Sequence, residues 1–468
     1  MERFKSAVIV SAVSVSLGAA VLLHAQRGSG GPPAQDPGVR AGSVGAGTPL
    51  STLNSDQVQF FQDGLARFVQ VDSVEGGAPG EPGIGLGPGF NANSCGSCHA
   101  QPSIGGTSPS QSQYPFLGPN PQMAIANDYS ATNIIPSFIT PDGPVREARF
   151  PFLVNPNGRV SNNPDGGVHD VFTIAGRQDA AGCTMPQPNF EAMQQANNII
   201  YRIPTPVFGA GLIEAIPDSA ILSNMAANAS VKQMLGITGH PNTSGNDGTI
   251  TRFGWKAQNK SLLIFAGEAY NVEQGVTNEA FPNERESAPD CQFNGTPEDT
   301  TNLVPTVKSV SPASDFSSDI VNFAGFMRLS AGPLPAPPNP STVNGQHVFT
   351  SIGCAACHLP VQTTGKSAFT GQSFVSFAPY SDFALHDMGE NLADDISQGS
   401  ADGNQVRTAP LWGLGQRLFF LHDGRSNTLV DAIHQHASSG SEANAVVNNY
   451  ELLSARNQQD LLNFLRSL

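Results

Sequence analysis

Apolar residues recur at helical spacing near the start, the middle and the end of the chain. One predicted helix covers residues 55–69, and its apolar face consists of Val58, Phe61, Leu65 and Phe68. A shorter helix is predicted near residues 341–351. Ser454 can cap a final helix whose apolar stripe consists of Leu461, Leu462, Leu465 and Leu468.

The stretches between these helices are irregular. Residues 100–330 hold short Val-, Ile-, Phe- and Thr-rich segments broken by Gly, Pro and Asn, which predicts loops with some β-structure. Residues 26–51 are rich in Gly, Pro, Ala and Ser and predict a flexible linker, while residues 332–340 predict a stiff one. We therefore expect a mainly α fold with irregular and minor β segments, divided into residues 52–331 and 340–468.

The amino terminus has the pattern of a signal peptide. Arg3 and Lys5 precede an apolar run over residues 7–23, and Ala25 is a small residue suited to cleavage. We expect residues 1–25 to be removed on export to the periplasm, with no stable membrane insertion. An uncleaved anchor helix is the alternative.

Charge limits the classes of partner. The net charge is −15, and only 13% of the residues are charged. This balance argues against nucleic acid and anionic membranes, whose phosphates would be repelled. A small basic electron-donor protein and a neutral small-molecule oxidant are compatible with it.

Two Cys-x-x-Cys-His motifs carry the most specific chemistry. They consist of Cys95, Cys98 and His99, and of Cys354, Cys357 and His358. In such motifs the two thiols add to the vinyl groups of a haem, and the histidine becomes the proximal iron ligand. Coincidental zinc or disulfide motifs are the alternative, although zinc would need further ligands nearby. We expect two covalently bound haem c groups.

Two cysteines remain outside the haem motifs. Cys183 and Cys291 are the only partners for each other among the six cysteines of the chain. Export permits a disulfide, which in the chain-entropy model would stabilise the fold by roughly 4–5 kcal/mol. Two buried free thiols are the alternative.

Six strings, in order along the chain, resemble a known family. They are Cys95-Gly-Ser-Cys-His-Ala-Gln-Pro-Ser-Ile-Gly-Gly106, Arg202-Ile-Pro-Thr-Pro-Val-Phe-Gly-Ala-Gly-Leu-Ile-Glu214, Arg252-Phe-Gly-Trp-Lys-Ala-Gln258, His386-Asp-Met-Gly389, Arg407-Thr-Ala-Pro-Leu-Trp-Gly-Leu-Gly415 and Leu421-His-Asp-Gly-Arg425. Over residues 52–468 the chain resembles the bacterial di-haem oxidoreductases, which are associated with peroxidase or thiol oxidoreductase activity. The C-terminal part more distantly resembles the di-haem cytochrome c peroxidases. The resemblance implies two cytochrome c-like haem domains, the first heavily elaborated, with one haem relaying electrons and the other reducing peroxide.

The sixth iron ligands are less apparent than the proximal ones. Met388 lies on a Gly-bounded loop within residues 340–468, and we expect it to ligate the second haem. In the peroxidases, methionine usually stands where this chain has Leu421, so His386 and His422 are alternatives. For His422 we favour a structural histidine that bonds to the backbone. For the first haem no distal ligand is apparent from the spacing, and we expect an open iron; His169 is the best remote candidate for a ligand, with a satisfied loop histidine as the alternative. His240, His347, His434 and His436 are interpreted as surface or local helix residues.

An open first haem would need proton donors for catalysis. Glu268 and Glu273 are the candidate acid–base residues, with structural carboxylates as the alternative. Either of the two tryptophans, Trp255 and Trp412, could lie between the haems and assist electron transfer.

The peroxidase resemblance also raises calcium as a further cofactor. Its candidate oxygen ligands are Asp394, Asp395 and Asp402, and solvated loop acids are the alternative.

Three classes of function fit these features. The first is a redox enzyme with one relay haem and one open haem that reduces peroxide or a related oxidant. The second is a pure electron carrier with both irons six-coordinate, and the third is a di-haem oxygenase acting on an apolar substrate. The large region between the motifs favours an enzyme, since carriers need little more than the cytochrome fold.

Overall fold

The computed structural model describes residues 32–42, 45–109, 120–131, 133–155, 157–161, 163–285, 288–293, 297–301 and 317–468. The predicted signal peptide, residues 1–25, lies outside the described residues and stays a prediction. Within the described ranges, no helix combines the length and apolarity needed to cross a bilayer.

Helices and short strands are interspersed along the described chain. The helices are α1 (Ser55–Phe68), α2 (Cys95–Cys98), α3 (Pro121–Ile125), α4 (Phe190–Gln195), α5 (Ala210–Glu214), α6 (Asp218–Ala226), α7 (Ala229–Leu235), α8 (Leu262–Gln274), α9 (Asp319–Leu329), α10 (Pro340–Ile352), α11 (Leu429–Gln435), α12 (Asn444–Glu451) and α13 (Ala455–Ser467). The three predicted helices are confirmed as α1, α10 and α13, and the Ser454 side chain caps α13 by accepting from Asn457 N.

The sheets of the described part are antiparallel strand pairs. They are β1 (Gly89–Phe90) with β3 (Ile174–Ala175), β2 (Glu147–Arg149) with β4 (Ile200–Arg202), β5 (Asn242–Thr243) with β6 (Ile250–Thr251), β7 (Gln362–Thr363) with β8 (Ser376–Phe377), and β9 (Leu385–Asp387) with β10 (Gln405–Arg407). The fold is therefore mixed, with small sheets only, rather than mainly α.

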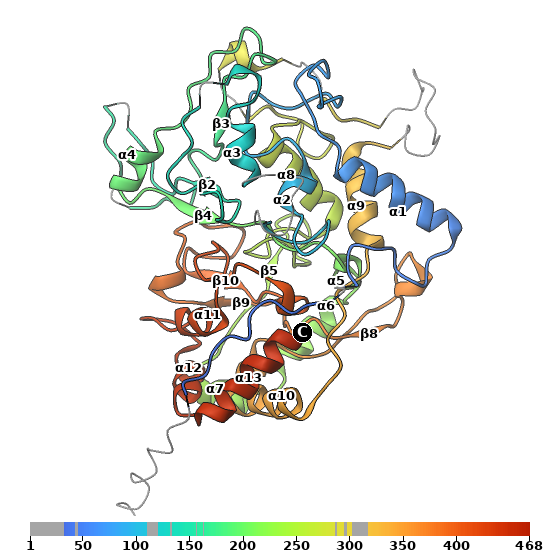
Figure 1. Ribbon diagram of the computed structural model, residues 1–468, viewed down its shortest axis with the longest axis vertical. Coiled ribbons are helices and arrows are strands. Elements are labelled where there is room, and N and C mark those ends of the chain that lie inside the picture. The colour runs from blue at the N-terminus through green and yellow to red at the C-terminus, as the bar shows by residue number, and fades with distance from the viewer. Residues whose placement is uncertain are drawn as a thin grey trace, which may run out of the picture.

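Helices α1 and α9 cross closely and form the centre of one hydrophobic core (Figure 1). A Cβ atom on Gly64 would clash with the backbone oxygen of Asn322, so glycine permits this close approach. One turn later, the ring of Phe68 lies 4.6 Å from that of Phe326 and 5.9 Å from that of His99. The crossing thus places an aromatic side chain beside the first haem motif.

Helices α10 and α13 repeat this arrangement around the second motif (Figure 1). A Cβ atom on Gly345 would clash with the backbone oxygen of Asp460. Phe349, one turn later, has its ring 5.4 Å from Phe464 and 6.5 Å from His358. Helices α1 and α10 therefore each carry a Gly-x-x-x-Phe string. In each string the glycine contacts a partner helix, and the phenylalanine lies near the motif histidine.

The two parts of the chain are in extensive contact. His240 N donates to Leu385 O at 3.0 Å, and Ile203 N donates to His422 O at 2.8 Å. The α7 residue Leu235 also lies against Gly353, directly before the second motif. The division into residues 52–331 and 340–468 stays a prediction.

The segment expected to be a flexible linker packs against the C-terminal part where it is described. Arg466 donates to both carboxylate oxygens of Asp36 at 2.7 Å, and Leu429 N donates to the same carboxylate at 2.6 Å. Arg466 is 5% exposed. Composition alone did not reveal the buried cation that Asp36 neutralises, and the linker stays a prediction.

The predicted disulfide is present. Cys183 is bonded to Cys291, which lies 108 residues later, and the bridge lies in a small core with Ala175 and Met185. It ties the segment after β3 to the segment after α8.

Replacing Asp36 with alanine should lower the free energy of unfolding by about 1–3 kcal/mol, because the buried Arg466 loses its partner. Burial raises the pKa of Asp36, but hydrogen bonds from Arg466 and Leu429 outweigh it and lower the pKa overall. The stabilisation is therefore present above the unfolded pKa and is lost as the pH falls through the folded pKa. Denaturant unfolding measures this loss, with the exposed Asp142→Ala as control. Equal effects of the two substitutions would contradict the prediction.

Candidate functional site

The first Cys-x-x-Cys-His motif lines a cavity, here called the first cavity, of about 1110 Å³ that is partly open to solvent. Helix α2 carries Cys95 and Cys98, whose thiols are both free. The Nδ1 atom of His99 lies 3.0 Å from Gly106 O. Burial lowers the pKa of His99 to about 4, so the ring stays neutral, as an iron ligand must be.

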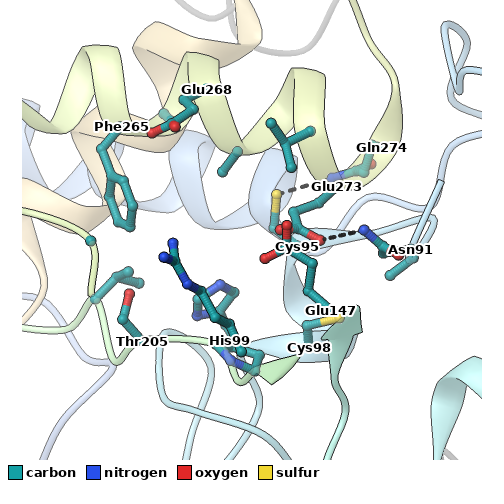
Figure 2. Close-up of a pocket in the computed structure, with 18 of the residues that line it drawn as sticks. Asn91, Cys95, Cys98, His99, Glu147, Thr205, Phe265, Glu268, Glu273 and Gln274 are labelled. Atoms are coloured by element: carbon teal, nitrogen blue, oxygen red, sulfur yellow. Dashed lines mark hydrogen bonds between the residues drawn. The ribbon is translucent and has the colours of Figure 1, made fainter. Parts of the chain in front are cut away.

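Helix α8 forms the wall of the first cavity that faces His99. Figure 2 shows Phe265, Glu268 and Glu273 on this helix, with His99 and Thr205 on the opposite side. Gln274, at the end of α8, donates to Cys95 Sγ at 3.2 Å. A group attached to the thiols would thus have α8 above it and His99 below it.

Both predicted carboxylates, Glu268 and Glu273, line the first cavity. Asn91 donates to Glu273 Oε2 at 3.0 Å. Burial, followed by the nearby charge of Glu147, raises the pKa of Glu273 to about 8. Asn259 and Gln258 donate to Glu268 Oε2. The cavity therefore holds one carboxyl that exchanges a proton near neutral pH and a second that is held by amides.

The sequence did not identify Glu147 and Arg149, which also line this cavity. They lie at alternate positions of β2, on one side of the strand, and Arg149 Nε is 2.8 Å from Glu147 Oε1. Alternating charges in Glu-Ala-Arg were the available signal. Together they place a cation and a second carboxylate beside Glu273.

The second motif lines a separate cavity, here called the second cavity, of about 1400 Å³. Cys354 and Cys357 are free, and His358 Nδ1 lies 3.1 Å from Tyr380 O. Burial, followed by the nearby His436, lowers the pKa of His358 to about 4. Much of the wall is apolar, including Phe349, Ile352, Leu392, Leu414, Leu429, Leu461 and Leu465.

The residues of both cavities fit a covalently bound haem. Each cavity combines two free thiols with a neutral histidine whose Nδ1 is held by a backbone carbonyl, as iron-ligating histidines usually are. Among the described residues, no group of three or more His, Cys, Asp or Glu side chains could hold a metal ion. Neither motif therefore offers zinc a complete ligand set.

A family comparison agrees with this reading. Residues 162–468 match the family described as "Di-haem oxidoreductase, putative peroxidase". The chain belongs to this di-haem oxidoreductase family. The matched region contains the second haem motif and begins after the first, whereas the sequence resemblance was drawn from residue 52.

The other comparisons add little. No curated protein matches the chain. Among solved structures, the chain is similar to "Kuenenia stuttgartiensis Hydrazine Synthase Pressurized with 20 bar Xenon", with 18% sequence identity and a TM-score of 0.21. That alignment covers 34% of this chain and 59% of the other, so it spans less than two thirds of that chain.

The candidate sixth ligands of this di-haem oxidoreductase differ in their surroundings. Met388 lines the second cavity, and its role as the sixth ligand of the second haem stays a prediction. His386 also lines it, but its Nδ1 lies 2.7 Å from Glu442 and its Nε2 lies 3.1 Å from Asp382. Burial lowers the pKa of His386, but Cys357 and the two carboxylates raise it well above its usual range. Both ring nitrogens of His386 are therefore occupied by carboxylates, which leaves neither free to bind iron.

Two other histidines differ from expectation. The His422 ring lines the second cavity rather than bonding to backbone, and burial lowers its pKa to about 4. His169 is not among the residues that line the first cavity; its Nε2 lies 3.0 Å from Asp165 in an exposed loop. His436, interpreted from the sequence as a surface or local helix residue, lines the second cavity.

Trp255 is the tryptophan that lines both cavities. Its Nε1 donates to Ile203 O at 2.8 Å, and its ring lies 6.3 Å from that of His422. Trp412 instead packs against Phe377, with ring centroids 5.5 Å apart, and does not line either cavity. Of the two, Trp255 is thus in the position expected for a residue between the haems.

Two of the expected calcium ligands, Asp394 and Asp402, contact buried cationic side chains in the structure. Lys256 Nζ lies 2.8 Å from Asp394 Oδ1 and donates to Asp402 O and Gln405 O, both at 2.8 Å. Arg202 contacts the other Asp394 oxygen at 2.6 Å. An ammonium group and a guanidinium thus take up both carboxylate oxygens of Asp394, one of the three residues expected to bind calcium.

Titration of Glu273 can be tested directly. Because its pKa is about 8, infrared difference spectra should show a protonated carboxyl that ionises as the pH rises through this value. Because folding raises this pKa from its usual value of 4.5, the stability that the protonated carboxyl contributes is present below the unfolded pKa and is lost as the pH rises to about 8. Glu273→Gln should abolish both changes, whereas Glu268→Gln should leave them. A carboxyl signal that persists in Glu273→Gln would assign the proton elsewhere.

Proposed function

We propose that the protein is an exported di-haem c-type cytochrome oxidoreductase. In this proposal the haem at Cys354, Cys357 and His358 relays electrons, and the haem at Cys95, Cys98 and His99 reduces peroxide or a related oxidant. Two cytochrome c-like units hold the haems, each built around one of the Gly-x-x-x-Phe helices. Export to the periplasm follows from the signal-peptide pattern and would provide the setting for covalent haem attachment.

The difference between the two cavities carries the proposal. The first cavity combines three carboxylates, Glu147, Glu268 and Glu273, with Arg149. In the second cavity the lining carboxylate is Glu442, which is paired with His386; Arg407 and Arg417 also line the wall, and most of the remaining lining is apolar. Reduction of peroxide to two water molecules consumes two electrons and two protons. A reacting site therefore needs proton donors and a cation, while a relay site needs only a stable, dry iron environment.

The residues of the first cavity have separate parts in this chemistry. Glu273, with its pKa of about 8, can deliver a proton near neutral pH and recover it afterwards. Glu268 is also on α8, lines the same cavity and is oriented by Asn259 and Gln258. Arg149, next to Glu147, supplies positive charge for an oxygen that becomes negative during cleavage of the O–O bond.

Electrons would reach the first cavity through the wall that both cavities share. Trp255 contributes to that wall from both sides. The donor would be a small redox protein, and the net charge of −15 favours a basic surface on it.

Haem content is the first prediction. The mature protein from a host with cytochrome maturation should have the mass of the polypeptide plus two haems after denaturation and acid extraction. Replacing both Cys95 and Cys98 with serine should remove one haem, and replacing both Cys354 and Cys357 should remove the other. A wild-type mass with one haem or none would refute the di-haem assignment.

Catalysis gives a second prediction. The reduced or half-reduced protein should bind carbon monoxide at the first haem and consume peroxide. Glu268→Gln or Glu273→Gln should lower peroxide turnover by about 10²–10⁴-fold, the usual contribution of an acid–base group. Glu191→Gln on the exposed surface of α4 is the matched control and should keep full activity.

The alternatives predict other outcomes of the same experiment. A pure electron carrier would have two six-coordinate irons that refuse carbon monoxide in every redox state. Binding of carbon monoxide without peroxide consumption would favour an oxygenase.

A further inference from the structure

One face of α11 looks into the second cavity. Leu429, Ala432, Ile433 and His436 all line it, and they are spaced at i, i+3, i+4 and i+7. Residues at this spacing lie on one side of a helix. His436 therefore continues the cavity-facing side of α11 at its C-terminal end.

A backbone hydrogen bond orients the ring of His436. Its Nδ1 lies 2.6 Å from Ala432 O, and a carbonyl can only accept, so the proton is on Nδ1. Nε2 then carries a free lone pair, and no residue of the described chain hydrogen-bonds to it. A neutral imidazole with one nitrogen held by a carbonyl and the other free is the arrangement of an iron ligand.

His358 shows the same arrangement in the same cavity. Its Nδ1 lies 3.1 Å from Tyr380 O, and its other nitrogen is likewise free. The proximal ligand His358 and His436 thus share one arrangement, with Nδ1 held by a backbone carbonyl and Nε2 free. The other histidines of the cavity are not, since both nitrogens of His386 contact carboxylates and neither nitrogen of His422 has a hydrogen bond to orient it among the described residues.

Met388 is the remaining candidate on this cavity. It follows β9 two residues after His386, and alternate residues of an extended segment point to the same side. His386 Nδ1 lies 3.9 Å from Cys357 Sγ, so this side of β9 borders the edge at which the haem is attached. The position of Met388 therefore suits packing against the edge of the haem better than ligation of its iron.

We propose that His436 Nε2 is the second axial ligand of the haem held by Cys354, Cys357 and His358. This inference rests on the second covalent haem of the proposed function, but not on peroxide chemistry. Two imidazoles make the iron low-spin and give a lower potential than a histidine–methionine pair. The Ala432 carbonyl holds the ring and increases the basicity of Nε2.

Spectroscopy of the haem-loaded protein separates the two ligands. The oxidised wild type should have a low-spin second haem without the near-infrared sulfur–iron band, and Met388→Leu should leave that spectrum unchanged. His436→Met should introduce the band and raise the reduction potential. His436→Ala should convert the second haem to high spin, and added imidazole should restore the low-spin signal.

His434→Ala is the matched control, because His434 lies two residues away on α11 and its Nε2 contacts Glu451 at the surface. It should leave the spectrum unchanged. A sulfur–iron band in the wild type that Met388→Leu abolishes, or a low-spin second haem that persists in His436→Ala, would overturn the assignment. Loss of the second haem in the mass spectrum of the wild type would instead refute the proposed function.

Discussion

The wall between the two cavities depends on a buried ionic cluster centred on Asp394. Its carboxylate contacts Arg202 at 2.6 Å and Lys256 at 2.8 Å, and Lys256 also donates to the backbone oxygens of Asp402 and Gln405. Burial lowers the pKa of Lys256 to about 8. Loss of one partner from such a cluster typically costs 3–5 kcal/mol, because buried charges are left unpaired.

This cluster also fixes Trp255, the neighbour of Lys256 in the chain. Arg407 N donates to Trp255 O at 2.8 Å, and Trp255 Nε1 donates to Ile203 O at 2.8 Å. The tryptophan is thus held by β10 on one side and by the segment after β4 on the other. Fixed surroundings suit a side chain that lies between two cofactors, because they keep the distance between the cofactors constant.

The sequence revealed those features whose signal is local. The Cys-x-x-Cys-His motifs indicate haem attachment from residues that are adjacent in the sequence. Amphipathic spacing located α1, α10 and α13 because each exposes one polar face. Helices α8 and α9 were missed because they have apolar residues on several sides, as buried helices do, so no single stripe stands out. The role of the repeated Gly-x-x-x-Phe string follows only from the structure, in which Gly64 and Gly345 contact partner helices.

The parts that escaped prediction depend on contacts between distant segments. His436 is read as a helix residue until the cavity side of α11 is known, although its spacing from Leu429 and Ala432 was available. Lys256 satisfies backbone carbonyls that lie about 150 residues away, and such partners leave no pattern of side chains. Glu268 and Glu273 were identified as carboxylates able to exchange protons, and the structure brings both to one cavity.

We propose that two haems of different function exchange electrons through Trp255. Rapid mixing of the fully reduced protein with one equivalent of peroxide tests this, with the oxidation of the second haem followed by its absorbance. Trp255→Phe should slow this oxidation while carbon monoxide still binds the first haem, and Trp412→Phe should leave the rate unchanged. Equal rates in the wild type and both variants would show that electrons do not pass through Trp255.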